Sequence, residues 1–158
     1  MMATVAIPPF ERFYLETRDE VLRYLRRLLG QGAEDAWQET FLRALRAYDR
    51  LEHGRQLRAW AFTIATRVAL DELRKRPATP LSDVADLNGA EMARPSYLEL
   101  EHLTDRLPPT ERAAVVLRYG YDLPYAEIGA ALGSSEEAAR AAASSGVRRL
   151  RRNDDAAA

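Results

Sequence analysis

Helical periodicity runs through this sequence on both sides of one interruption, and that interruption most constrains the fold. Residues 77–95, PATPLSDVADLNGAEMARP, contain three prolines, a glycine and several acids, but too few large apolar residues to form a core. We interpret them as a flexible linker. The 158-residue chain then divides into domains at residues 1–76 and 96–158. Each needs close helix packing, because a domain of about 70 residues has a thin core.

The first domain is predicted to hold three helices whose ends are marked by proline and glycine. Pro8 and Pro9 precede the first helix, Gly30 and Gly32 follow it, and Pro77 stops the third. We expect these helices at about residues 10–29, 33–48 and 58–75. The polar stretch DRLEHGRQL between the last two is predicted to be a loop.

The helix expected over residues 33–47, AEDAWQETFLRALRA, separates apolar and polar side chains. The apolar side chains predicted to face the core are Ala36, Phe41, Leu42 and Leu45. The polar side chains that fall outside this stripe are Asp35, Gln38, Glu39 and Arg46. Acids in a first helical turn complement the helix dipole by roughly 0.3 to 1 kcal/mol each, so an acidic start is expected of any helix.

The second domain ends in a helix-turn-helix pattern. Helices are expected at about 96–106 and 109–119, followed by a short helix, YAEIGAALG, closed by Gly133. Ser134 or Ser135 can cap the last helix, at about 136–152.

Charge and composition exclude several function classes. The net charge of −1 argues against a generic nucleic-acid binder. This value is the sum of segment charges of +3 over residues 1–76, −5 over residues 77–105 and +1 over residues 106–158. No cysteine is present, which excludes disulfides and thiolate metal sites. The sequence lacks a signal peptide and any run of eighteen apolar residues, so we expect a cytoplasmic protein without membrane insertion.

An enzyme is the alternative from a different class. Glu34, Asp35 and Glu39 could be imagined as magnesium ligands. The sequence has no phosphate-binding loop, no histidine pair at ligand spacing and no nucleophile beside a base. We therefore predict a protein that is not an enzyme and that needs no metal or cofactor.

Two blocks of the sequence resemble a known family. AEDAWQETFLRAL followed by LRAWAFTIATRVALDELRKR resembles region 2 of the sigma-70 family, in particular the extracytoplasmic-function sigma factors. LPPTERAAVVLRY, LPYAEIGAALG and RRLR resemble region 4, in the same order. The resemblance covers about 110 residues. It implies an all-α fold of two small helical domains that binds core RNA polymerase and directs promoter recognition and transcription initiation. The nearest alternative is a sigma-like DNA-binding regulator that does not itself initiate.

The resemblance also implies roles for particular residues. Those expected to meet the clamp helices of core polymerase are Asp35, Gln38 and Glu39. Those expected at the −10 element are His53, Arg55, Gln56, Arg58, Trp60, Arg67, Arg74, Lys75 and Arg76. Those expected at the −35 element are Ser135, Glu136, Glu137, Arg140, Ser144 and Arg148. Trp37 could anchor the polymerase interface or be buried against the first helix. Trp60 and Phe62 are candidate platforms for an unstacked base, and Trp60 could instead be buried in the core.

The sequence departs from the family at two places. Arg67 stands where relatives commonly have asparagine, so a phosphate contact is expected there rather than base recognition. The last helix has Arg140 as its only cation before Arg148, so we expect weak binding of the −35 element. The implied partners are core RNA polymerase and promoter DNA, and an anti-sigma factor is left open. Promoter elements two turns apart are separated by about 70 Å. The linker reaches roughly 65 Å when extended, so it suffices only in that form, with the width of the two domains making up the rest.

Overall fold

Six α-helices make up most of the chain that the structure describes. The computed structural model describes residues 5–76 and 104–157. The all-α class predicted from the sequence is confirmed for these residues. The elements in chain order are α1 (Phe10–Leu29), α2 (Ala33–Tyr48), α3 (Leu57–Lys75), a 3₁₀ turn η1 (Thr104–Arg106), α6 (Pro109–Val115), a π-helical turn η2 (Val116–Gly120), α7 (Tyr125–Leu132) and α8 (Glu136–Ala157).

Local breakers end the first helices where the sequence predicted. Gly30 follows α1 with φ 63°, and its N–H donates to the Arg26 carbonyl. Gly32 precedes α2 with φ 83°. Both lie in the left-handed region, which glycine enters without steric cost. The tight turn between them lets α1 and α2 pack against each other.

Aromatic rings fill the centre of the three-helix layer. Phe13 is buried, and its ring centroid lies 5.5 Å from that of Trp60, 5.6 Å from that of Tyr48 and 6.1 Å from that of Phe41. Tilted and edge-on pairs at such distances contribute roughly 0.5 to 1.5 kcal/mol each beyond burial. This cluster joins all three helices of the first region.

The orientation of α2 differs from the sequence-based expectation. Leu42 and Leu45, predicted to face the core, are 48% and 52% exposed. The buried side of α2 consists of smaller residues and two aromatics: Ala33, Ala36, Thr40, Phe41, Ala44 and Tyr48. Alanines let helix backbones approach closely, and the flanking rings supply the apolar area, so the leucines are left on the outside.

The second region contains the predicted helix-turn-helix. Gly133, with φ 69°, follows the end of α7. The Ser135 hydroxyl accepts from the Ala138 N–H at 3.1 Å, as expected of the cap of α8. A Cβ on Gly146 would lie 2.6 Å from Val115 Cγ2, so α6 and α8 cross with no room for a side chain there. α8 extends to Ala157, five residues beyond the predicted end.

Other expectations concern the middle of the chain. The helix predicted over residues 109–119 is present, but its second half is the π-helical turn η2. The proposed linker, residues 77–95, lies outside the described residues. So do residues 96–103 of the helix predicted to follow it, while residues 104–106 form the 3₁₀ turn η1.

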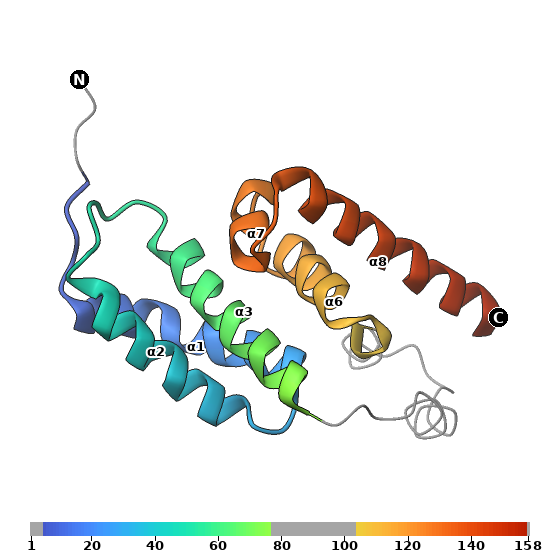
Figure 1. The fold of residues 1–158 in the computed structure, drawn as a ribbon, viewed down its shortest axis with the longest axis horizontal. Helices are drawn as coiled ribbons and strands as arrows, with labels where there is room; N and C mark the ends of the chain where they lie inside the picture. The colour runs from blue at the N-terminus through green and yellow to red at the C-terminus, as the bar shows by residue number, and fades with distance from the viewer. Residues whose placement is uncertain (1–4, 77–103, 158) are drawn as a thin grey trace.

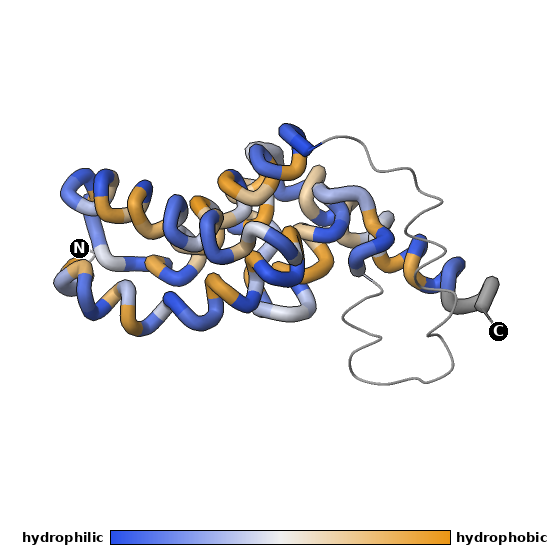
Figure 2. Tube along the Cα trace, turned by 90° about the horizontal axis from the view of Figure 1, so that it is seen from below, coloured by the Kyte–Doolittle hydropathy of each residue, from blue (hydrophilic) through white to orange (hydrophobic). Residues whose placement is uncertain are grey.

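The two regions pack against each other through α3. Figure 1 shows α3 between the α1–α2 pair and the α6–α7 pair, with α8 on the far side. The hydropathy of each helix alternates along its length, as expected of amphipathic helices that share a core (Figure 2). Buried side chains of both regions form one contiguous cluster. Over residues 5–76 and 104–157, we find no helix with the length and apolar character needed to cross a bilayer.

Candidate functional site

One side of α2 presents the residues that the resemblance assigns to polymerase binding. Asp35 and Gln38 are exposed, and Glu39 is half-buried. Leu42 and Leu45 follow at spacings of four and seven residues from Gln38, so they extend the same side of the helix. The result is a surface, here called the α2 surface, in which two exposed leucines lie beside acidic and amide groups.

Arginines hold two carboxylates of α2, one on the α2 surface and one beside it. The Arg26 guanidinium donates to the Glu34 carboxylate at 3.1 Å, and this hydrogen bond holds the pKa of Glu34 below its usual value. Arg43 lies 3.6 Å from Glu39, one helical turn away. Across the described stretches, no three His, Asp or Glu residues gather closely enough to hold a metal ion.

Trp37 lies against α1. Its indole Nε1 donates to the Arg18 carbonyl at 2.9 Å, and its ring centroid lies 5.8 Å from that of Tyr14 and 5.4 Å from that of Phe41. Of the two possibilities considered from the sequence, this contact matches burial against the first helix.

The loop before α3 is tied to the N-terminal segment. The Gly54 N–H donates to the Val5 carbonyl at 2.9 Å, and a Cβ at Gly54 would lie 2.3 Å from the Ala6 oxygen. His53 Nδ1 accepts from the Arg55 N–H at 3.2 Å. Gln56 has φ 56°, which is uncommon for a residue other than glycine. The three predicted base-contacting residues of this loop therefore lie on a backbone that is held in place.

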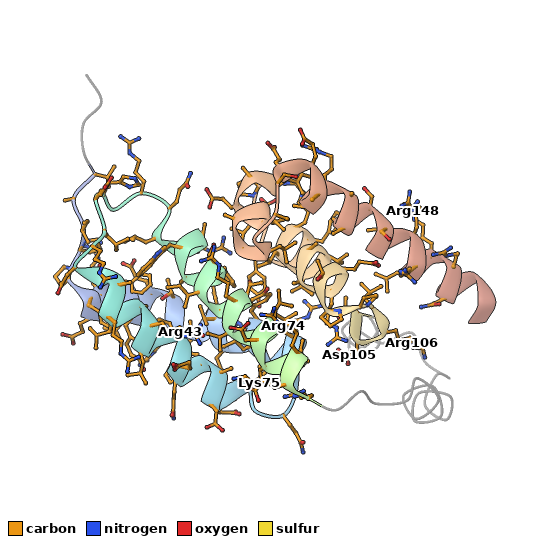
Figure 3. The ribbon with its side chains drawn as sticks, viewed as in Figure 1. Arg43, Arg74, Lys75, Asp105, Arg106 and Arg148 are labelled. Atoms are coloured by element: carbon orange, nitrogen blue, oxygen red, sulfur yellow. The ribbon has the colours of Figure 1, made fainter. Side chains whose placement is uncertain are left out.

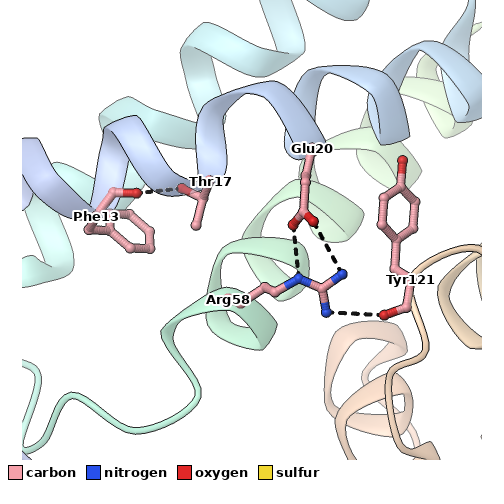
Figure 4. Close-up of polar contacts among 5 residues, drawn as sticks. All are labelled: Phe13, Thr17, Glu20, Arg58 and Tyr121. Atoms are coloured by element: carbon pink, nitrogen blue, oxygen red, sulfur yellow. Dashed lines mark hydrogen bonds and ion pairs between the residues drawn. The ribbon is translucent and has the colours of Figure 1, made fainter.

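Arg58 is engaged within the protein. Its Nε lies 2.8 Å from Glu20 Oε2, and its Nη1 donates to the Tyr121 carbonyl at 3.0 Å (Figure 4). Its guanidinium carbon also lies 5.3 Å from the centre of the Phe62 ring. Arg58 thus bridges α1, α3 and the segment before α7.

The remaining cations of α3 differ in their contacts. Arg67 Nη2 donates to the Ala130 carbonyl at 3.1 Å, and Arg76 donates to the carbonyls of Leu29 and Gln31. These two guanidiniums therefore fix helix packing. Arg74 pairs with its neighbour Asp71, and Lys75 beside it is exposed. Figure 3 shows Arg74 and Lys75 at the end of α3, well separated from Arg148 on α8.

The two candidate platforms for an unstacked base, Trp60 and Phe62, both pack against core residues. Trp60 is partly buried and packs on Phe13 and Tyr48. Phe62 is only 1% exposed, and its ring lies 5.2 Å from that of Tyr24 and 4.8 Å from that of Tyr121. In this conformation Phe62 therefore offers no face to a nucleotide, whereas Trp60 is only partly buried.

The start of α8 carries the residues predicted to contact the −35 element. Glu136, Glu137, Arg140, Ser144 and Arg148 are exposed along it. Arg140 lies 3.4 Å from Glu136, and its guanidinium carbon lies 4.5 Å from the centre of the Tyr125 ring. These contacts hold the first cation of this helix in one orientation.

Sequence reasoning missed three contributors to the surfaces described above. Leu42 and Leu45 share a face with Gln38, and their spacing from it could have shown this. Tyr121 contacts both Tyr24 and Phe62, at 5.8 Å and 4.8 Å between ring centroids, across the two regions. No local pattern in the sequence indicates that long-range contact.

Comparisons with known proteins agree with this arrangement. Residues 13–79 match the family model described as Sigma-70 region 2, and residues 104–152 match that of Sigma-70, region 4. The chain is 34% identical to RNA polymerase sigma factor CarQ of Myxococcus xanthus, covering 90% of this chain and 87% of CarQ. It is 35% identical to ECF RNA polymerase sigma factor SigE of Mycolicibacterium smegmatis, covering 81% of this chain but about half, 54%, of SigE. The sigma factor RpoE of Bartonella quintana, solved with the anti-sigma factor NepR, shares the fold at a TM-score of 0.72 and 22% identity, covering 90% of this chain and 94% of RpoE.

Proposed function

Because this chain belongs to the sigma-70 family as an extracytoplasmic-function RNA polymerase sigma factor, we propose that it binds core RNA polymerase and directs promoter recognition and transcription initiation. This proposal is carried by the matches to Sigma-70 region 2 and region 4, which occur in that order along the chain. It is also supported by the similarity to CarQ, which extends over 87% of the length of CarQ. Sigma factors are not themselves catalytic. The protein then works in the cytoplasm, where polymerase and promoters are found.

The proposed domains are residues 1–76 for polymerase and the −10 element and residues 96–158 for the −35 element, joined by residues 77–95. The α2 surface is the proposed docking site for the polymerase clamp helices. Its acids favour association with basic side chains, and its two exposed leucines supply the apolar centre that protein interfaces use for affinity.

The −10 element is proposed to bind the loop before α3 and the cations of α3. Arg74 and Lys75, at the exposed end of the helix, support phosphate contacts, which position DNA without reading its sequence. His53, Arg55 and Gln56 are the proposed donors to bases, because the loop backbone that carries them is held by Gly54.

The −35 element is proposed to bind the first turns of α8, where Arg140 is the side chain able to make a bidentate contact to guanine. Ser135, Glu136, Glu137, Ser144 and Arg148 complete the proposed surface. Arg140 already lies against Tyr125 and Glu136, so it is pre-oriented. An anti-sigma factor is included among the proposed partners, because the structural relative RpoE was solved with one.

Run-off transcription with purified core polymerase tests the proposal. A sigma factor gives a transcript of defined length that is absent when core polymerase is used alone. Binding to core polymerase or to DNA without any transcript, across a library of promoter fragments, would instead indicate a sigma-like regulator.

A further inference from the structure

The loop between α2 and α3, residues 49–56, is held near its centre by the segment that precedes α1. The Gly54 N–H donates to the Val5 carbonyl at 2.9 Å. Figure 1 shows this N-terminal segment, residues 5–9 in blue, running beside the loop in green. A backbone hydrogen bond thus joins two parts of the chain that are remote in sequence.

The contact leaves no room for a side chain at Gly54. A Cβ there would overlap the Ala6 carbonyl oxygen and would lie 3.3 Å from Ile7 Cα. Gly54 does not have a φ in the left-handed region, so its own backbone conformation does not require glycine. Glycine is needed at this position because the N-terminal segment lies so close.

The N-terminal segment is itself fixed on the first region. The Tyr48 hydroxyl donates to the Pro8 carbonyl, and Ile7 packs against the core. The Tyr48 ring also meets that of Phe10 edge-on, at 5.2 Å between centroids. Proline restricts φ to about −65°, so Pro8 and Pro9 stiffen the segment further. The loop is therefore held by a rigid support.

The supported loop carries the proposed donors to bases. These donors are His53, Arg55 and Gln56. All three are exposed, because the contact with the N-terminal segment uses backbone atoms of Gly54. Leu51 and Leu57 pack against the core at the two ends of the loop. The loop is thus held at its ends and at its centre, while the donor side chains stay accessible.

Fixing the loop before DNA arrives favours selective binding. A flexible loop must be ordered when it binds, and the cost of that ordering lowers affinity. Such a loop can also rearrange its donors to suit several bases. A loop held in one conformation presents its donors in one arrangement, which suits one base better than the others.

We propose that Val5 and Ala6 are positioning residues for recognition of the −10 element. The Val5 carbonyl holds Gly54, and Ala6 packs against it, so together they set the arrangement in which the loop meets a base. This inference rests on the proposed role of the loop in base recognition. All the contacts that support it lie within residues 5–76, so it does not depend on how the second region is placed.

The experiment removes the contact from either side in the otherwise complete chain. Deleting residues 2–6 removes Val5 and Ala6 but keeps Ile7 and Pro8, which hold the rest of the segment on the first region. Gly54→Ala keeps the segment but places a Cβ where Ala6 now lies. Deleting residues 2–4 is the matched control, because it shortens the chain and keeps both positioning residues.

The main measurement is run-off transcription with core polymerase. The templates are a promoter fragment that the parent chain transcribes and its single-base variants across the −10 element. Deletion of residues 2–6 and Gly54→Ala are each expected to lower the preference for the parental base by about 2- to 13-fold, which corresponds to the net contribution of one hydrogen bond. The control deletion is expected to leave the preference unchanged.

Two accompanying measurements separate positioning from general stability. Affinity for core polymerase, measured by fluorescence titration, is expected to be equal in all variants, whereas a destabilised fold would lower it as well. Exchange of the Gly54 amide with deuterium, followed by NMR, is expected to be faster after deletion of residues 2–6, because the Val5 acceptor is gone.

The combined variant tests whether the two changes act on one contact. With residues 2–6 deleted, a Cβ on residue 54 no longer meets Ala6, so Gly54→Ala is expected to add no further loss of base preference. A full additional loss would overturn the inference, because it would show that the glycine serves the loop itself.

Two results for the deletion of residues 2–6 would also overturn the inference, and they decide it even if Gly54→Ala fails to fold. One is an unchanged exchange rate of the Gly54 amide. The other is an unchanged −10 preference when that amide exchanges faster. A parent chain that yields no transcript from any promoter fragment would instead refute the proposed function, and this inference with it.

Discussion

Replacing Leu42 and Leu45 together with alanine should weaken binding to core polymerase. The two side chains are 48% and 52% exposed in the free protein, so about half of each remains to be buried by a partner. Complete burial of a leucine contributes roughly 1.5 to 3 kcal/mol, so the exposed halves of the pair offer about 1.5 to 3 kcal/mol together. That free energy corresponds to about a 10- to 150-fold increase in Kd, and retention of the alanine Cβ favours the lower end.

The assay is a fluorescence titration of labelled sigma factor with core polymerase. Leu15→Ala is the matched control, because Leu15 is 51% exposed but lies on α1, outside the α2 surface. Alanine is at least as good a helix former as leucine, so α2 should keep its helicity, which circular dichroism checks.

Two results would refute this reasoning. An unchanged Kd for the folded double variant would show that the exposed leucines are not part of the polymerase interface. An equal loss of affinity for Leu15→Ala would show that the effect does not come from the α2 surface.

Three further predictions concern charged residues. Asp35→Lys with Glu39→Lys should weaken polymerase binding by roughly 1 to 3 kcal/mol while circular dichroism stays the same, because the acids are expected to pair with basic side chains across the interface; unchanged affinity in the same titration would contradict the docking assignment. Arg74→Ala with Lys75→Ala should weaken open-complex formation at every promoter and flatten its salt dependence by about one unit of slope per lost phosphate contact; a promoter-dependent loss would argue against phosphate binding. Arg140→Ala should cost roughly 1 to 3 kcal/mol at the −35 element alone, measured by transcription from promoters with single-base changes; if the −35 preference survives, the start of α8 does not read bases.

The helix ends were predictable because local chemistry sets them. Gly30, Gly32 and Gly133 all have positive φ, and Ser135 caps α8 with its hydroxyl. These signals act within a few residues of the helix end, so one sequence contains all the information needed. The end of α1 at Leu29 and the start of α2 at Ala33 follow from the two glycines between them.

The orientation of α2 was not predictable in the same way. Ranking side chains by hydrophobicity places Leu42 and Leu45 in the core ahead of Ala33 and Ala44. The structure buries the alanines, because the rings of Phe41 and other aromatics already fill the space between the helices. Which apolar side of a helix faces inward depends on the volume that its neighbours leave.

Contacts between the two regions lie furthest from what a sequence can reveal. Arg58 and Arg67 have the charge and position expected of phosphate-binding residues. Yet each donates a hydrogen bond to a backbone carbonyl 63 residues away along the chain. Only the packing of α3 against α7 and the segment before it brings those carbonyls within reach. The resemblance to a family therefore indicated what these residues could bind, but not what they contact in the free chain.

The single contiguous core that joins α1–α3 to α6–α8 has a consequence for unfolding. Domains that are merely tethered melt independently, whereas halves that share buried surface lose it together. Heating should accordingly give one cooperative transition with equal calorimetric and van't Hoff enthalpies. A destabilising substitution deep in the first half, such as Phe13→Leu, should then lower the melting temperature reported by α8 as much as that reported by α1. The two halves, although the chain between them was interpreted as a linker, would be one thermodynamic unit in the free protein.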